Sequence, residues 1–282
     1  MTLQSDRAGQ AEQGGPATPP AAGQAGTADR IRAVVRDGDP GAAWAVGGPD
    51  GPDAVVEAGA RAHDGAGTGA RAEAGAGPDT AGDARAAEPA GALDVGGLAG
   101  VLAVWPVIGI LVDAGELHLH TPLTAYGAGG DLPPGTTAHQ LLTQGPGPSP
   151  ALVELAERLC GGPLAAFAAD RVWRPLGMTR TRFAADGTLR APVADLARFL
   201  SHLLTPAGGP VSPQWTAQSL RIRTGELVPA RGLLWHPAPH GAWSHGEGAA
   251  LWVSPRVRRW AALLPTTPSA PLRTAFRDAV FG

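Results

Sequence analysis

The segment GLLWHPAPHGAWSHGEGAALWVSPRVRRWAALLP, residues 232–265, decides the fold class. Four short apolar runs alternate in it with turn residues: GLLW (232–235), GAWSH (241–245), GAALWVS (248–254) and RRWAALLP (258–265). Short apolar runs bounded by Gly and Pro are typical of antiparallel strands. We therefore predict a set of antiparallel strands near the C-terminus, followed by a closing helix over APLRTAFRDAV (270–280).

The N-terminal part of the chain carries a matching hairpin signal. GAAWAVGG (41–48) and AVVEAGARA (54–62) flank the turn sequence PDGPD (49–53), and a helical pattern over 29–38 precedes them. Strands at both ends of a chain and helices between them favour an α+β fold. We expect one sheet that joins the two ends.

The middle of the chain has the periodicity of helices. SPALVELAERLCGG (149–162) and PVADLARFLSHLL (192–204) place leucines on one face at helical spacing. The run 98–115 is apolar nearly all round, which predicts a buried helix that Pro106 kinks or splits.

Two stretches lack any periodic pattern. Residues 1–28 are rich in Gly, Ala, Gln and Pro, and we predict a disordered tail there. Residues 64–92 are rich in Gly, Ala, Asp and Thr and predict a flexible insertion. The remaining domain spans 30–282.

Composition excludes several classes of function. The chain has 282 residues, a formal net charge of −3 and no lysine or asparagine, a bias typical of a GC-rich bacterium. The mild charge gives no sign of a nucleic-acid partner. The N-terminus lacks the apolar core of a secretory signal, and no apolar run has the length of a membrane span, so we expect a cytoplasmic protein without membrane contact. Cys160 is the single cysteine, and we expect a structural role for it with a raised pKa.

Several ordered segments resemble one known family. They are LVDAGELHLHTPLTAY (111–126), TAHQLLTQ (137–144), RVWRPLGMTRTRF (171–183), VADLARFLSHLL (193–204), RGLLW (231–235) and SHGEGAALWVSP (244–255). They are similar to the serine β-lactamase and penicillin-binding-protein-like family, which includes class C β-lactamases, DD-carboxypeptidases and esterases. The resemblance covers about residues 30–282. It implies a β-lactamase/transpeptidase-like fold, in which terminal strands form an antiparallel sheet flanked by helices with a helical subregion.

The same resemblance points to a lost active site. The family's nucleophilic serine and its lysine in the Ser-x-x-Lys motif fall on Gly97 and Gly100 in LDVGGLAGVLA (93–103). GPGPSP (145–150) stands where the Tyr-x-Asn motif is expected, and the third motif survives in part as SHGEG (244–248). The resemblance therefore implies a degenerate member without catalytic residues or cofactor. Its vestigial pocket would comprise Gly97, Gly100, Ser244, His245, Gly246 and Glu247.

Alternatives remain open at this point. Gly97 and Gly100 are also explained by close packing of a neighbouring element. An active esterase or amidase with substituted residues is a second hypothesis, although adjacent strand residues such as Ser244 and His245 point to opposite faces. A third hypothesis is a metal site made of His236, His240, His245 and Glu247.

The preferred expectation is a non-catalytic homologue with a binding, scaffolding or regulatory role, whose partner is an unknown small molecule or protein. Asp113, Glu116 and Asp195 near helix ends suit solvation or capping.

Overall fold

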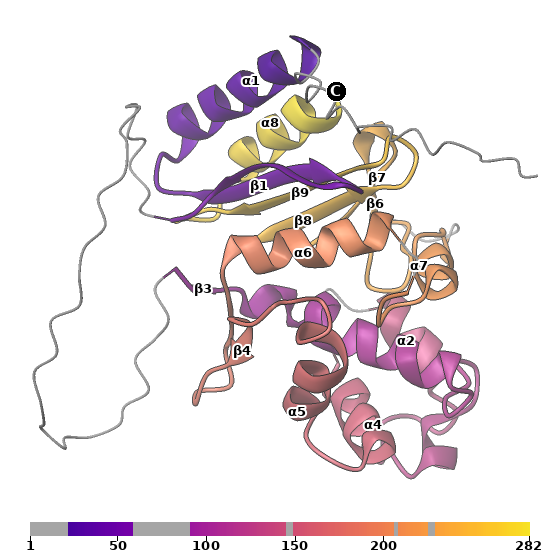
Figure 1. Cartoon of the computed structure of the whole chain (residues 1–282). Coiled ribbons are helices and arrows are strands. Elements are labelled where there is room, and N and C mark those ends of the chain that lie inside the picture. The colour runs from indigo at the N-terminus through magenta and orange to yellow at the C-terminus, as the bar shows by residue number, and fades with distance from the viewer. Residues whose placement is uncertain (1–21, 59–90, 145–148, 206–207, 225–228) are drawn as a thin grey trace, which may run out of the picture.

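A six-stranded antiparallel sheet occupies the upper half of the computed structural model (Figure 1). The structure describes residues 22–58, 91–144, 149–205, 208–224 and 229–282. The strands are β1 (Ala43–Gly48), β2 (Gly51–Val56), β6 (His236–Ala238), β7 (Ala242–His245), β8 (Ala250–Ser254) and β9 (Arg259–Leu264). Their order in space is β2-β1-β9-β8-β7-β6. Since β1 pairs with β9, the predicted sheet that joins both ends of the chain is confirmed.

Helices cover both faces of this sheet. On one face lie α1 (Ala22–Gly38) and α8 (Ala270–Phe281) side by side, and on the other lies α6 (Val193–Leu204) (Figure 1). Successive side chains of a strand point to opposite faces of the sheet. In β1, Trp44 and Val46 belong to the core under α1 and α8, whereas Ala43 and Ala45 belong to the core on the opposite face. A sheet buried on both faces explains why its central strands are almost continuously apolar.

A helical subregion lies below α6 (Figure 1). Its helices are α2 (Trp105–Asp113), α3 (Ala138–Gln144), α4 (Pro150–Cys160), α5 (Leu164–Ala168) and α7 (Pro213–Ser219), and a small sheet of order β3-β5-β4 (Leu93–Asp94, Leu189–Ala191, Arg182–Phe183) accompanies them. The predicted helix over 149–162 is confirmed: Leu152 and Leu155 are buried, and Gly161 ends the helix in the left-handed conformation that glycine favours.

The predicted buried helix after residue 98 forms as three joined segments. A 3₁₀ turn (Gly96–Leu98) is followed by a π-helical turn (Gly100–Val104) and then by α2. Pro106 lies in the first turn of α2, where a proline is tolerated. In a regular α-helix the N–H of residue 106 would bond the carbonyl of Leu102; Trp173 Nε1 donates to that carbonyl instead, at 2.7 Å. The Trp173 indole therefore satisfies the carbonyl that Pro106 leaves without its helical donor.

Two local predictions were wrong. GLLW (232–235) is not a strand, because Leu234 adopts a φ of 60° and its N–H bonds the carbonyl of Leu142. Helix α1 begins at Ala22 and not at 29, so the predicted disordered tail is helical over 22–28. The predicted tail up to residue 21 and nearly all of the predicted insertion lie outside the described residues.

Candidate functional site

A cavity of about 500 Å³ opens where the helical run begins beside the end of β7. The residues that line it are Gly96, Gly97, Pro229, Arg231, His236, Ser244, His245, Gly246, Glu247, Gly248 and Arg273. The structure therefore brings together all the residues of the expected vestigial pocket except Gly100, which is buried at the start of the π-helical turn.

Gly97 has free space around it. It is exposed, its φ lies outside the left-handed region, and a Cβ atom built on it would meet no atom within 4 Å. Close packing would require the opposite, so the packing explanation is wrong for Gly97. The helix start at this cavity has room for a side chain that the sequence does not supply.

His245 forms the buried floor of the cavity. Its Nδ1 lies 2.6 Å from the carbonyl oxygen of Leu234, which can only accept, so Nδ1 carries the proton. Burial lowers the pKa of this imidazole to about 4. Its Nε2 is buried and has no hydrogen-bond partner of normal geometry among the described residues. At neutral pH His245 is thus an uncharged ring in a fixed tautomer.

Ser244 lacks the partners of a nucleophile. It is buried on β7 next to His245, and the described part of the chain contains no hydrogen bond from its hydroxyl group to His245 or His236. A serine needs a hydrogen-bonded base to lose its proton at neutral pH. The part of the chain that the structure describes gives Ser244 no such base.

Two arginines and one glutamate give the cavity its charge. Arg273 of α8 lies over the Trp252 ring at 5.6 Å, and Arg231 donates to the carbonyl oxygen of Gln144 at 2.7 Å. Glu247 is exposed at the rim and favours the charged form of Arg273, whose pKa burial lowers. Burial, helped by the two arginines, also lowers the pKa of His236. The arginines come from segments that sequence patterns did not connect to the site.

The four proposed metal ligands do not converge. His240 sits outside the cavity on an exposed turn with a φ of 62°, and its Nε2 lies 3.2 Å from a carboxylate oxygen of Asp278. The protonated Nδ1 of His245 is engaged with Leu234. Across the described ranges, no three His, Cys, Asp or Glu residues are grouped so that they could hold a metal ion. The described geometry therefore gives no support to a zinc site made of these four residues.

Other candidate groups lie elsewhere. Burial, together with the charge of Glu116, raises the pKa of the Cys160 thiol to about 11, in the expected direction. The hydroxyl group of Tyr126, the single tyrosine, accepts from the backbone N–H of His118. Residues 145–148, in the expected Tyr-x-Asn region, lie outside the described residues.

Solved structures of several hydrolases resemble the whole fold. A β-lactamase from Mycobacterium bovis is 23% identical, with a TM-score of 0.63 over 87% of this chain and 96% of that one. A family VIII carboxylesterase is 13% identical, with a TM-score of 0.67 over 93% and 97% of the two chains. A D-alanine carboxypeptidase from Burkholderia cenocepacia is 16% identical, with a TM-score of 0.61 over 91% and 98%.

These likenesses establish the class of fold. The chain has the α+β fold of the β-lactamase/transpeptidase group, with an antiparallel sheet of N- and C-terminal strands flanked by helices. No protein-family model and no curated protein sequence matches it. Among the described helices, none combines the length and the apolar character needed to cross a membrane.

Proposed function

We propose that this protein is a non-catalytic homologue of serine β-lactamase-like hydrolases that binds a small organic anion in the Gly97 cavity without turning it over. The observation that carries the proposal is the free space around Gly97. An exposed glycine with free space around it occupies the helix start where the resemblance places the nucleophile.

The absence of catalytic groups supports the first half of the proposal. The whole chain has no lysine that could act as the general base of a Ser-x-x-Lys pair. Among the described residues Ser244 has no hydrogen-bonded base, and the protonated nitrogen of His245 is held by Leu234. A second nucleophile would need an activating partner that the described residues of the cavity do not provide.

The charge of the cavity supports an anionic ligand. Arg231 and Arg273 carry two positive charges against the single negative charge of Glu247. The two lining imidazoles are neutral at pH 7 because burial lowers their pKa values. Guanidinium groups bind carboxylates through strong paired hydrogen bonds, so a carboxylate is the favoured anchoring group.

The test measures turnover and binding on the same preparation. Hydrolysis of a chromogenic cephalosporin and of a p-nitrophenyl ester is expected to stay at the buffer rate. Titration calorimetry with benzylpenicillin, a small organic anion, is expected to show binding that weakens roughly tenfold for its uncharged methyl ester. Turnover that follows the protein through purification would establish the active-hydrolase alternative.

A matched pair of glycine variants locates the binding. Gly97→Phe fills the cavity and should abolish benzylpenicillin binding. Gly130→Phe is the control, because Gly130 is also exposed, has an ordinary φ and has free space around it, but lies outside the cavity. Equal binding by both variants, or no binding by the unmodified protein, would contradict an anion site at Gly97.

A further inference from the structure

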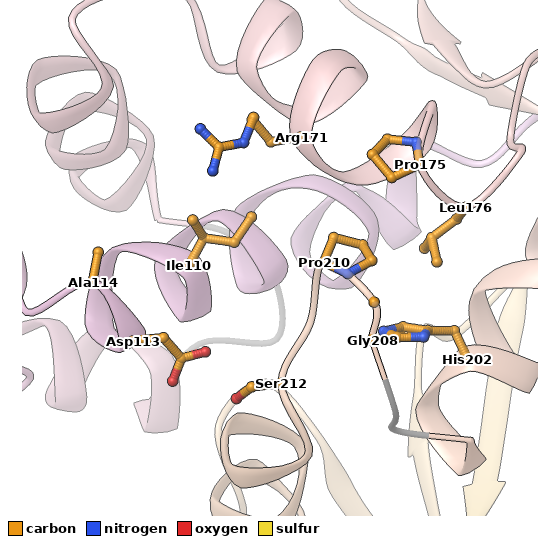
Figure 2. A pocket seen from close by; sticks show the side chains of 11 residues that line it. Ile110, Asp113, Ala114, Arg171, Pro175, Leu176, His202, Gly208, Pro210 and Ser212 are labelled. Atoms are coloured by element: carbon orange, nitrogen blue, oxygen red, sulfur yellow. The ribbon is translucent and has the colours of Figure 1, made fainter.

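A second cavity, of about 660 Å³, lies away from the Gly97 site and shares no lining residue with it. It lies between the end of α2, a π-helical turn over Ala169–Trp173, the end of α6 and the segment that leads into α7 (Figure 2). Its lining residues are Ile110, Asp113, Ala114, Arg171, Pro175, Leu176, His202, Gly208, Gly209, Pro210 and Ser212. The volume is in the range of sites for small molecules.

Arg171 lines this cavity with a charged guanidinium group. None of the described carboxylates forms an ion pair with it. Its guanidinium lies over the Phe167 ring, at 5.5 Å from the centroid, which restrains the side chain. Arg174, three residues further on, forms an ion pair of 2.7 Å with Asp170. Arg171 makes no such ion pair within the described segments, so its charge is available to an occupant of the cavity.

Asp113 supplies the opposite charge. It is the last residue of α2, where the helix dipole disfavours a carboxylate. It is exposed, and the described residues provide it with no ion pair, Arg171 included. In the view of Figure 2, Ile110 lies between Arg171 and Asp113, so the two charges flank an apolar side chain. The sequence alone suggested only solvation or capping for Asp113.

The opposite wall of the cavity is neutral and mostly apolar. His202 Nε2 donates to the carbonyl oxygen of Val211 at 3.0 Å, and burial lowers the pKa of His202. Gly209 packs so close to this imidazole that a Cβ atom there would overlap the ring. Pro175, Leu176 and Pro210 complete this side. The cavity therefore carries one positive charge, one negative charge and an apolar wall.

We infer that this cavity binds a small zwitterion with an apolar side chain, a free amino acid or a dipeptide. Its carboxylate pairs with Arg171, its ammonium group pairs with Asp113, and its apolar side chain packs on Ile110 and the proline-rich wall. A zwitterion can pair with both charges at once, whereas a simple anion or cation can pair with only one of them.

The probe is the dipeptide leucyl-leucine, titrated into the whole protein by calorimetry and followed by amide chemical shifts. N-acetyl-leucyl-leucine lacks the ammonium charge and leucyl-leucinamide lacks the carboxylate charge. Each is expected to bind at least roughly tenfold more weakly than the dipeptide. Gly97→Phe, which fills the other cavity, should leave dipeptide binding unchanged, so this inference stands or falls independently of the proposed function.

Paired variants assign the two charges. Arg171→Gln should abolish the preference for the dipeptide over its amide, and Asp113→Asn should abolish the preference over the acetylated form. Arg174→Gln and Glu116→Gln are the matched controls, since both residues are exposed nearby and neither lines the cavity. No dipeptide binding up to about 10 mM, or equal binding of all three probes, would overturn the inference.

Discussion

Two glycines of one helical run have opposite surroundings. At Gly97, where the run begins, an added Cβ atom would meet nothing within 4 Å. At Gly109, inside α2, an added Cβ atom would overlap the indole ring of Trp215. Trp215 is buried there, and its Nε1 donates to the carbonyl oxygen of Trp105 at 3.1 Å.

Packing therefore requires glycine at position 109, whereas at position 97 it leaves space that a side chain could fill. Around Gly109 the tryptophans 105, 215 and 235 fill the core, where the ring centroid of Trp105 lies 5.9 and 6.1 Å from those of the other two. Around Gly97 the space belongs to a cavity with charged walls. In the sequence both are glycines in an apolar run, and only their surroundings in three dimensions distinguish them.

Gly109→Ala should produce the largest effect. The buried, hydrogen-bonded indole of Trp215 cannot easily move away, so overpacking should lower the free energy of unfolding by about 3 kcal/mol. Urea unfolding measures the change. A variant as stable as the unmodified protein would show that the Trp215 contact is not tight and would remove the contrast with Gly97.

Acid should weaken the region of the Gly97 cavity through His245. The pKa of His245 is about 4 in the folded chain and 6.5 in the reference state. Below pH 6.5 the unfolded chain therefore binds a proton that the folded chain does not, and stability falls as the pH falls towards 4.

Between pH 7 and pH 5 the contribution of His245 is a loss of about 2 kcal/mol. Urea unfolding at a series of pH values should show this slope, and His245→Gln should reduce it. The same slope in the variant and in the unmodified protein would mean that His245 titrates normally.

Trp173→Phe tests how the run accommodates Pro106. The variant removes the donor to the Leu102 carbonyl and leaves that buried group without it. The expected cost is about 1.5 kcal/mol. The control is Trp252→Phe, because the Trp252 indole also packs in a core but belongs to the one under α1 and α8, away from the helical run. If Trp173→Phe costs no more stability in urea unfolding than Trp252→Phe, which also removes buried indole volume, the proposed replacement of the proline's missing donor is wrong.

Gly97 substitutions should have the smallest effect on stability. Gly97→Ala should change the free energy of unfolding by less than about 0.5 kcal/mol. The thiol introduced by Gly97→Cys should react with a thiol reagent faster than Cys160, which is only partly exposed and has a pKa raised to about 11. If the introduced thiol reacts as slowly as Cys160, the cavity is closed in solution.

Local patterns predicted most of the fold. The leucine spacing of α4 and α6 specified those helices, because helix faces depend on nearby residues. The hairpin of β1 and β2 was also predicted, but β2 (Gly51–Val56) begins inside the predicted turn PDGPD. The conformation of Leu234 could not be predicted from local patterns. Its positive φ goes with a backbone hydrogen bond to the carbonyl of Leu142, which is distant in the sequence.

The sites were less accessible to sequence reasoning. The resemblance placed the family's nucleophile at Gly97, but the sequence gave no sign of the space around this glycine. Arg231 and Arg273 reach the cavity from separate segments, and no short-range pattern relates them. Asp195, expected to cap or face solvent, is fully buried and accepts hydrogen bonds from Thr181 and Arg198. Such groupings depend on tertiary packing, which spacing alone does not encode.

Intact-protein mass spectrometry after incubation with a fluorophosphonate, and separately with benzylpenicillin, tests the central claim most directly. Both reagents form covalent adducts with an activated serine. The proposal that the protein has no catalytic nucleophile predicts an unchanged mass in both cases. One stoichiometric adduct on a serine of the folded protein, lost when the protein is first denatured, would contradict it.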